Sequence, residues 1–437
     1  MKRAALHNLG CKVNSYEAEA MLRMLSEAGY EIVDFDRDIA DVYIINTCSV
    51  TNIADRKSRQ MLHKAKKMNP DSIVIAAGCY AQSAAEDLEI DDAVDIIVGN
   101  NKKKDIVSVI EEYCKEKENH RAVIDIGHTE EYEDLEIEKV SEHTRAYIKI
   151  QDGCNQFCSY CIIPYTRGRI RSRQIESIVT EVKRLAENGY KEVVLTGIHL
   201  SSYGAELDKK ITLLDVIKQL HEIEGLERIR LGSLEPRIVT EEFVQELSNM
   251  KKVCPHFHLS LQSGCDTVLK RMNRKYTTKE YLKGCEILRK YYGNPAITTD
   301  VIVGFPGETQ EEFEITRKFL NQVRFYEMHI FKYSRRKGTV ADRMENQVPD
   351  DIKTVRSNEL LELDRKLSEQ FRKEYIGARV PVLFEEEVHM DGESYYVGHT
   401  AAYIKCAVKS EKNLINTICD VELQGINEQG IMTGNIR

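Results

Sequence analysis

Three cysteines lie within eight residues, at Cys154, Cys158 and Cys161, and form the pattern C-x3-C-x2-C. Thiolates at this spacing can reach one small inorganic centre. A structural zinc site usually takes four ligands in two pairs and a disulfide takes two cysteines, so neither explains a set of three. A four-iron cluster held by three thiolates keeps one iron open for a non-protein ligand. The alternatives are a zinc site with a remote fourth ligand, or cysteines buried as small hydrophobic residues.

A second set of three cysteines lies earlier in the chain, at Cys11, Cys48 and Cys79. Each follows a short apolar run that is typical of a buried strand. The carboxyl ends of parallel strands share one edge of a sheet, so three such turns would bring these thiols together. We therefore interpret them as ligands of a second iron–sulfur cluster. The alternative is burial as small hydrophobic residues, which accounts for the cysteines that follow no positional rule: Cys114, Cys254, Cys285, Cys406 and Cys419.

The chain has 437 residues, enough for two or three domains with separate cores. Its first residues hold no apolar stretch long enough for a signal peptide, and no later segment is apolar enough to span a bilayer. Twelve cysteines without an export signal indicate a reducing compartment, so we expect a cytoplasmic protein with no membrane partner. The net charge of −9 argues against indiscriminate coating of nucleic acid but permits a local basic groove.

Cys11, Cys48 and Cys79 must be positioned by residues 1–115, which alternate strand-like runs with amphipathic helices. This pattern predicts an α/β domain with a mostly parallel sheet. The strand candidates are Ala4–Leu9, Val42–Asn46, Ile73–Ala77 and Ile96–Val98. Residues 116–143 are polar and acidic, and we interpret them as a linker with a candidate strand at Val123–Ile126.

Cys154, Cys158 and Cys161 lie in residues 144–372, where the alternation is more regular. Six strand–helix units favour a partial β/α barrel over a flat doubly wound sheet, although periodicity alone does not separate the two. The strand candidates are Ala146–Ile150, Glu192–Leu195, Arg228–Gly232, His256–Leu261, Thr298–Val303 and Glu327–Phe331. Residues 373–437 alternate apolar and polar residues between glycines, which predicts a small β-barrel of the oligonucleotide-binding (OB) kind.

The cysteine motifs resemble those of a known family. Cys154–Cys161, with Tyr160 before the last cysteine, resembles the radical S-adenosylmethionine (SAM) enzymes. Together with Gly10-Cys-Lys-Val-Asn14, Asn46-Thr-Cys-Ser-Val-Thr51 and Gly78-Cys-Tyr-Ala-Gln82, it resembles the methylthiotransferases over nearly the whole chain. The resemblance implies an N-terminal cluster domain, a radical SAM core and a C-terminal TRAM barrel. It also implies two [4Fe-4S] clusters, with catalytic roles for Cys154, Cys158 and Cys161, and SAM bound at their cluster.

Finer motifs separate the branches of this family. One branch modifies isopentenyladenosine in tRNA, one an aspartate of a ribosomal protein, and one threonylcarbamoyladenosine at position 37 of tRNA. Several segments look most like the third branch, including Lys57-Ser-Arg-Gln60, Gln151-Asp-Gly-Cys154, His258-Leu-Ser-Leu-Gln-Ser-Gly264, Val268–Thr277 and Asp300–Thr309. The resemblance therefore predicts replacement of the adenine C-2 hydrogen by a methylthio group, at a cost of two SAM molecules. A different class, a non-catalytic metal-binding protein that binds RNA, is the remaining alternative.

The carboxyl ends of the barrel strands should line the SAM pocket. Beside Tyr160, the resemblance points to backbone at Thr196 and Gly197 for the amino group of SAM. Polar groups of Gln262 and Ser263 could bind its ribose or carboxylate, and Gly304 would permit close approach of an adenine. At each position an ordinary structural role, as a turn glycine or as a hydrogen-bonded polar side chain, is almost as good an interpretation as SAM binding. His199, His258 and Glu235 are left without a role.

Basic residues cluster beside the cysteine motifs. Arg167, Arg169, Arg171 and Arg173 alternate along the chain, so a strand there would place all four on one face. Such a row could bind the phosphates of an anticodon stem-loop. Further basic residues follow the sixth strand and Cys48: Lys332, Arg335, Arg336, Lys337, Arg56, Lys57 and Arg59. We therefore expect tRNA as a partner, along with a reducing donor such as flavodoxin or ferredoxin.

The C-terminal barrel fits RNA binding less well. Residues 373–437 contain six Lys or Arg against ten Asp or Glu, and Ala402 stands where the family usually has asparagine. Binding of tRNA by charge alone is therefore not expected here. Stacking of bases on Tyr395, Tyr396 or Tyr403 is one reading, and packing of these rings in the core is at least as good a reading.

Overall fold

The computed structural model describes residues 2–116, 120–137, 144–207, 211–390 and 392–437. The N-terminal domain is a parallel sheet in the order β2-β1-β3-β4-β5-β6. Its elements are β1 (Arg3–Asn8), α1 (Lys12–Glu27), β2 (Glu31–Ile32), β3 (Val42–Thr47), α2 (Asn52–Met68), β4 (Ile73–Gly78), α3 (Cys79–Ser83), α4 (Ala85–Glu89), β5 (Ile96–Val98), η1 (Lys103–Asp105), α5 (Ile106–Glu116), β6 (His120–Ala122) and η2 (Ile126–His128).

Both faces of this sheet are covered by helices, as its uninterrupted apolar strands require. Tyr43 and Ile45 pack toward Leu62 of α2 on one face. On the other face Ile44 packs with Met21 of α1 and with helix α5. The predicted strands of residues 1–115 are confirmed to within one or two residues.

The segment expected to be a linker contributes to this sheet. Strand β6 pairs in parallel with β5 and lies just before Val123–Ile126, where a strand was predicted. That prediction was wrong by a few residues, because the pairing edge of β5 selects His120–Ala122. Residues 117–119 and 138–143 of the predicted linker lie outside the described residues.

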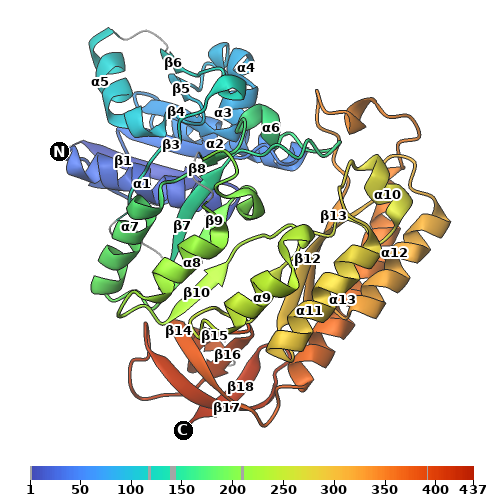
Figure 1. Ribbon diagram of the computed structural model, residues 1–437. Helices are drawn as coiled ribbons and strands as arrows, with labels where there is room; N and C mark the ends of the chain where they lie inside the picture. The colour runs from blue at the N-terminus through green and yellow to red at the C-terminus, as the bar shows by residue number, and fades with distance from the viewer. Residues whose placement is uncertain (1, 117–119, 138–143, 208–210, 391) are drawn as a thin grey trace.

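The central domain is a partial barrel (Figure 1). Two sheets, β10-β9-β7-β8 and β11-β12-β13, are joined by parallel bridges at Ile229–Val253 and Leu234–Leu259. Its elements are β7 (Arg145–Asp152), α6 (Ile163–Thr166), β8 (Arg171–Ser172), α7 (Ile175–Glu187), β9 (Glu192–Gly197), η3 (Leu200–Ser202), α8 (Leu213–His221), β10 (Arg228–Leu231), η4 (Pro236–Ile238), α9 (Glu241–Ser248), β11 (His256–His258), α10 (Asp266–Arg271), α11 (Thr278–Tyr292), β12 (Ala296–Val303), α12 (Gln310–Val323), β13 (Glu327–Lys332), η5 (Ala341–Arg343) and α13 (Asp350–Lys373).

The six predicted barrel strands are confirmed, and the bridges between β10 and β11 decide for a curved arrangement over a flat one. The barrel is open because β8 runs antiparallel to β7 at one edge and no strand pairs with the far side of β13 among the described residues. Capping boxes at Thr277 and Thr309 begin α11 and α12, each worth about 1 kcal/mol.

The last domain is the predicted small barrel, closed in the order β14-β15-β16-β18-β17. Its strands are β14 (Arg379–Met390), β15 (Glu393–Thr400), β16 (Lys405–Val408), β17 (Ile418–Ile426) and β18 (Met432–Ile436). It lies against the lower end of the central barrel in Figure 1. No helix in the described part of the chain has the length and apolar character needed to cross a bilayer.

Candidate functional site

The loop that carries Cys154, Cys158 and Cys161 begins directly after β7. Gly153 turns the chain there with a φ of +69°, and a Cβ at this position would lie 1.8 Å from the carbonyl oxygen of Arg169. Only glycine can therefore make this turn. The Cys154 amide donates to the Gly168 carbonyl (3.0 Å), and the Cys161 amide donates to the Cys158 carbonyl (3.0 Å). These bonds fix the three thiols on one short, curved segment.

Residues after α10 hold the same loop from the other side of the barrel. Asn273 Nδ2 donates to the Phe157 carbonyl (2.8 Å), and the Ser159 amide donates to the Met272 carbonyl (3.0 Å). Arg274 Nη1 lies 3.3 Å from Cys158 Sγ. The cysteine loop is therefore bound to a segment more than a hundred residues away. The contact between Arg274 and Cys158 was not predicted, because an arginine three residues after α10 forms no distinctive sequence pattern.

The three thiols open into a cavity of about 190 Å³ at the carboxyl ends of the barrel strands. Besides the cysteines, it is lined by Gln156, Tyr160, Ile163, Ile198, His199, Ser233, Leu234, Glu235, Ser260, Gln262 and Arg274. Burial lowers the pKa of His199 to about 4, so its ring is neutral at pH 7. Its Nε2 is buried and has no partner among the described residues. An orphaned polar atom in a cavity with several other polar groups fits a polar ligand such as SAM.

The chemistry of the thiols fits a metal centre. Burial raises the pKa of Cys154 to about 11 and that of Cys161 to about 12, so both are protonated at pH 7 without a metal. A bound metal displaces these protons, because the thiolate is the ligand form. Cys154, Cys158 and Cys161 would hold the cluster, and the polar residues of the cavity would face the ligand of its open iron.

The residues predicted to bind the cofactor are only partly brought to this cavity. Tyr160 and Gln262 line it, whereas Thr196 and Gly197 lie just before the lining residues Ile198 and His199. Ser263 is fully buried, and its Oγ contacts Thr316 Oγ1 (3.2 Å) and accepts from the Cys265 amide.

Gly304 also lies away from the cavity. Its amide donates to Glu308 Oε2 (2.7 Å), and a Cβ there would meet the Lys353 side chain at 2.3 Å. Neither Ser263 nor Gly304 is among the lining residues of this cavity, and their assignment to the cofactor stays a prediction.

The second cysteine set lies at one edge of the N-terminal sheet, as the strand-end argument predicts. Cys11 is the N-cap of α1, Cys48 follows β3 and Cys79 begins α3 after β4. Strands β3 and β4 end in register, with Thr47 opposite Gly78, so the next residues on both strands are Cys48 and Cys79. Gly10 brings Cys11 to the same point, since a Cβ on Gly10 would lie 3.1 Å from Cys48 Sγ.

Two asparagines border these thiols. Cys11 Sγ lies 3.8 Å from Asn14 Oδ1, and Asn100 Nδ2 lies 3.5 Å from Cys79 Sγ. Burial, and then the neighbouring Cys79 and Cys11, raise the pKa of Cys48 to about 11. Cys48 and Cys79 are buried, while Cys11 is exposed. As thiolates the three would repel one another, so they suit a metal centre that neutralises their charge and fit a [4Fe-4S] cluster.

The predicted RNA-binding row of arginines is wrong for three of its four members. Arg167, Arg171 and Arg173 are at most 1% exposed. Arg167 pairs with Glu17 and Asp152, and Arg173 pairs with Glu181 and Asp134. The strand in this segment is only Arg171–Ser172, so no continuous face of arginines forms. Arg167 and Arg173 join the N-terminal domain to the barrel, because they contact Glu17 and Tyr16 of α1.

Arg169 is the exposed member, and it lies beside an open groove of about 520 Å³ behind the cysteine loop. Its guanidinium stacks over the Phe157 ring, 4.6 Å from the ring centre. Tyr165, 52% exposed, meets Phe157 edge-on at 6.3 Å. Arg121 also lines the groove. Exposed aromatic rings next to arginines form a surface on which unpaired bases can stack.

Other predicted basic residues are also used internally. Arg336 is 7% exposed and donates to Asp55 Oδ2 (2.6 Å) and Asn52 Oδ1 (2.8 Å) of α2. It therefore ties the segment after β13 to the N-terminal domain.

Tyr403 of the C-terminal barrel is an anchor between domains. Its ring stacks between His256 (4.9 Å) and His399 (4.6 Å), and Arg145 and Arg230 lie over it. Tyr396 belongs to the barrel core, and Tyr395 has Lys409 over its ring. Packing is thus the better reading for Tyr396 and Tyr403, and their rings are not free to stack on RNA.

Comparisons with known proteins agree with the two cysteine sites. Residues 148–320 match the Radical SAM superfamily, and residues 3–99 match a family described as Uncharacterized protein family UPF0004. Each match contains one complete cysteine set. In fold, the chain is similar to the radical S-adenosylmethionine methyltransferase TsrM from Kitasatospora setae, with a TM-score of 0.58 at 15% identity, over 90% of this chain and 82% of that one.

Curated relatives cover nearly the whole chain. The threonylcarbamoyladenosine tRNA methylthiotransferase MtaB of Bacillus subtilis is 40% identical over 97% of this chain and 94% of its own length. The protein of that name from Thermotoga maritima is 34% identical over 99% and 97%. The tRNA-2-methylthio-N(6)-dimethylallyladenosine synthase of Finegoldia magna is 35% identical over 96% and 91%. With both cysteine sets in place, this chain belongs to the methylthiotransferase family of radical SAM enzymes.

Proposed function

We propose that the protein converts N6-threonylcarbamoyladenosine at position 37 of tRNA to its 2-methylthio derivative by radical SAM chemistry. The observation that carries the reaction is the pair of three-thiol sites in one chain, one at the barrel mouth and one at the sheet edge. The substrate is supported by the curated relatives from Bacillus subtilis and Aquifex aeolicus, both 40% identical and both named for it.

The residues around the barrel cavity have separable tasks in this proposal. Bound to Cys154, Cys158 and Cys161, a [4Fe-4S] cluster would supply the electron that splits SAM into methionine and a 5′-deoxyadenosyl radical. Arg274 places a positive charge beside Cys158 Sγ, where an anionic cluster would lie. Neutral His199 and Gln262 present polar atoms to SAM, while Tyr160 closes the cavity wall against Phe305.

The N-terminal thiols are proposed to hold a second [4Fe-4S] cluster, from which sulfur is delivered to the adenine. Their support is the shared sheet edge and the asparagines that border it. A second SAM supplies the methyl group. All twelve cysteines are free, which suits a reducing cytoplasm, and we propose a donor of the flavodoxin or ferredoxin kind for the electron.

The substrate assignment predicts a clear difference between two tRNA pools. Transfer RNA that carries threonylcarbamoyladenosine should gain the methylthio group, while the same tRNA lacking that modification should react at least about tenfold more slowly, since a site built for polar groups rejects a substrate without them. Mass spectrometry of digested nucleosides measures the product in vitro and in a strain lacking this protein. Methylthiolation of isopentenyladenosine instead would move the chain to the branch of the Finegoldia magna relative.

The groove at Phe157 and Arg169 is proposed to contact the anticodon loop. Replacing Arg169 with alanine should weaken tRNA binding by up to about tenfold and reduce the salt slope by about 0.7, the value for one phosphate contact on a single strand. Tyr165→Ala should weaken binding without changing the slope, because it removes stacking and no charge. Fluorescence anisotropy across a salt series measures both.

Arg365, an exposed arginine of α13, supplies the control, because Arg365→Ala removes the same charge elsewhere. Equal losses in Arg169→Ala and Arg365→Ala would show that the groove has no special part in tRNA binding.

A further inference from the structure

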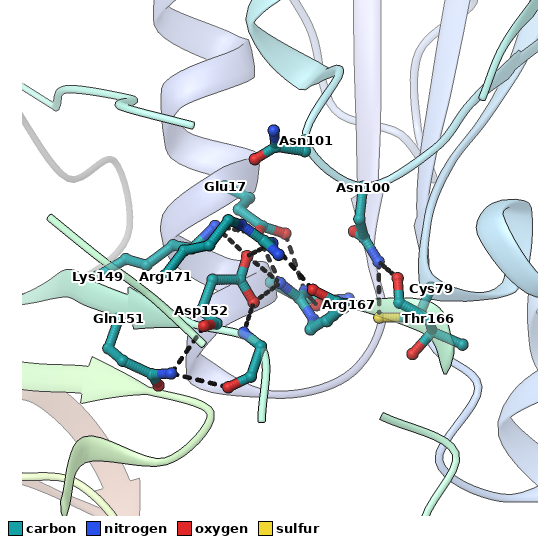
Figure 2. Close-up of polar contacts among 12 residues, drawn as sticks. Glu17, Cys79, Asn100, Asn101, Lys149, Gln151, Asp152, Thr166, Arg167 and Arg171 are labelled. Carbon is teal, nitrogen blue, oxygen red and sulfur yellow. Dashed lines mark hydrogen bonds and ion pairs between the residues drawn. The ribbon is translucent and has the colours of Figure 1, made fainter. Parts of the chain in front are cut away.

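A set of fully buried charges lies where the N-terminal domain meets the barrel (Figure 2). Its carboxylates are Glu17 of α1 and Asp152 of β7, and its cations are Lys103, Lys149, Arg167 and Arg171; none is more than 2% exposed. The proposed reaction assigns no task to any of them. Moving a charged group from water into the protein interior costs free energy, so the burial of six charged groups in one place requires an explanation.

Arg167 is at the centre of this set. Its Nη1 lies 2.8 Å from Glu17 Oε1 and 3.1 Å from both oxygens of Asp152, and its Nη2 lies 3.0 Å from Glu17 Oε2. Lys149 Nζ lies 2.7 Å from each of the same carboxylates, and Lys103 Nζ lies 3.0 Å from Glu17 Oε2. One guanidinium thus joins a carboxylate of each domain.

The set is not neutral. Burial would raise the pKa of Glu17, but Arg167, Lys103 and Lys149 hold it well below its ordinary value, so Glu17 is ionised. Four cations against two carboxylates leave an excess of two positive charges. Glu133 is buried nearby, binds the Lys104 amide and could lower that excess to one. Uncompensated positive charge in a buried place is unfavourable unless an anion lies within reach.

The N-terminal thiols lie within that reach. Arg167 Nη2 donates to Asn14 Oδ1 (2.7 Å), the oxygen that borders Cys11 Sγ. The neighbouring Thr166 carbonyl accepts from Asn100 Nδ2 (2.7 Å), which also borders Cys79 Sγ, while Lys103 Nζ donates to Asn100 Oδ1 (2.6 Å). Two short paths therefore connect the charged set to two of the three thiols.

The same residues reach the barrel cysteines. Asp152 Oδ1 accepts from the Gly153 amide (2.8 Å), and Gly153 directly precedes Cys154. A cluster on three thiolates is anionic, because the thiolates carry more charge than the iron–sulfide core offsets. The excess positive charge and the two paths fit such a group at Cys11, Cys48 and Cys79.

We propose that Arg167 is a positioning residue that stabilises the anionic centre at Cys11, Cys48 and Cys79 and fixes its place relative to the Cys154 loop. This inference rests on the second cluster of the proposed function. Net charge near a cluster is one determinant of its reduction potential. Arg167 therefore raises the potential of this cluster, and Glu17 lowers it.

Because Arg167 and Glu17 carry opposite charges, removing one or the other should shift the reduction potential of the cluster in opposite directions. In full-length protein with Cys154, Cys158 and Cys161 replaced by alanine, only the N-terminal cluster titrates, and its potential is followed by electron paramagnetic resonance. Arg167→Gln should shift the potential downward, Glu17→Gln should shift it upward, and the double variant should lie near the parent. General loosening of the domain interface would move both single variants in the same direction and would contradict the proposal.

Positioning is tested in the enzyme with both clusters. Arg167→Gln should still form 5′-deoxyadenosine, but the methylthio product per 5′-deoxyadenosine should fall by about tenfold or more. This is the size of effect expected when a residue that supports a metal ligand is removed. Arg167→Lys keeps the positive charge but loses the forked guanidinium that binds two carboxylates at once. The reduction potential of the N-terminal cluster should therefore stay near the parent value, while the coupling, the methylthio product formed per 5′-deoxyadenosine, should fall.

Arg173→Lys is the matched control. Arg173 is equally buried at the same interface and pairs with Glu181, but no contact joins it to a cysteine among the described residues. It should change neither potential nor coupling. If Arg167→Gln does not fold, the conservative pair Arg167→Lys and Arg173→Lys still decides, because equal coupling in both contradicts the inference. If the parent protein holds no iron at Cys11, Cys48 and Cys79, both the second cluster and this inference are wrong. If the cluster is present but its potential and the coupling do not respond to these substitutions, only the inference is wrong.

Discussion

Replacing Cys154, Cys158 and Cys161 together with alanine is expected to abolish SAM cleavage and to halve the iron content. Anaerobically reconstituted protein should hold roughly eight irons, and the variant roughly four, because each cluster has its own three ligands. Formation of 5′-deoxyadenosine should fall by at least about 100-fold, since even an outer partner of a metal ligand is worth 10–100-fold. Iron analysis and chromatography of the nucleoside product measure the two effects.

A triple variant of other cysteines controls for this experiment. Cys285 and Cys406 pack in hydrophobic clusters, and Cys254 is buried close to Arg230 and Glu192. None of the three lines the cysteine cavity, so their replacement by alanine should leave iron content and SAM cleavage near the parent values. One equivalent of zinc, without iron-dependent absorbance, would contradict the iron–sulfur assignment and return the cysteine loop to the zinc alternative.

Replacing Cys11, Cys48 and Cys79 with alanine should separate the two halves of the reaction. SAM cleavage depends on the barrel cavity, where none of these residues lies, so 5′-deoxyadenosine should form at close to the parent rate. Methylthio product should fall to background, at least about 100-fold, because no sulfur is held near the adenine. Both products are measured in one reaction with tRNA carrying threonylcarbamoyladenosine.

The fold of the variant needs its own check, since Cys48 and Cys79 are buried. Circular dichroism and unchanged tRNA binding would show that the domains remain assembled. Continued accumulation of methylthio product in a folded variant would make the three cysteines structural residues only.

Much of the architecture could be predicted from the sequence, because strand and helix periodicity is local. Strands such as Val42–Thr47 and Glu327–Lys332 were placed to within a residue or two from their apolar runs alone. The strand at His120–Ala122 was misplaced because its position depends on the free edge of β5 and not on its own composition. The closed C-terminal barrel followed from alternation and glycine spacing.

Within the candidate site, the sequence predicted which cysteines come together better than it predicted their surroundings. Both cysteine sets were found because spacing and strand ends are properties of the chain itself. Arg274 was missed because its contact with Cys158 joins residues 116 positions apart. For Ser263 and Gly304 the sequence could not separate cofactor binding from packing, because a polar or glycine residue near a strand end looks the same whether it faces a cavity or a helix.

By itself, the sequence predicted two sets of three cysteines at strand ends, the order of the parallel sheet, the partial barrel and the small β-barrel, and the family of the protein. The tertiary structure alone decided the roles of the arginines that follow Cys161. An alternating row of Arg167, Arg169, Arg171 and Arg173 indicates a basic face on local grounds, but the carboxylates of Glu17, Asp152 and Glu181 come from other elements. Burial of a charge depends on which distant partners meet it, so only the folded chain separates an exposed arginine that can contact RNA from a buried one that holds two domains together.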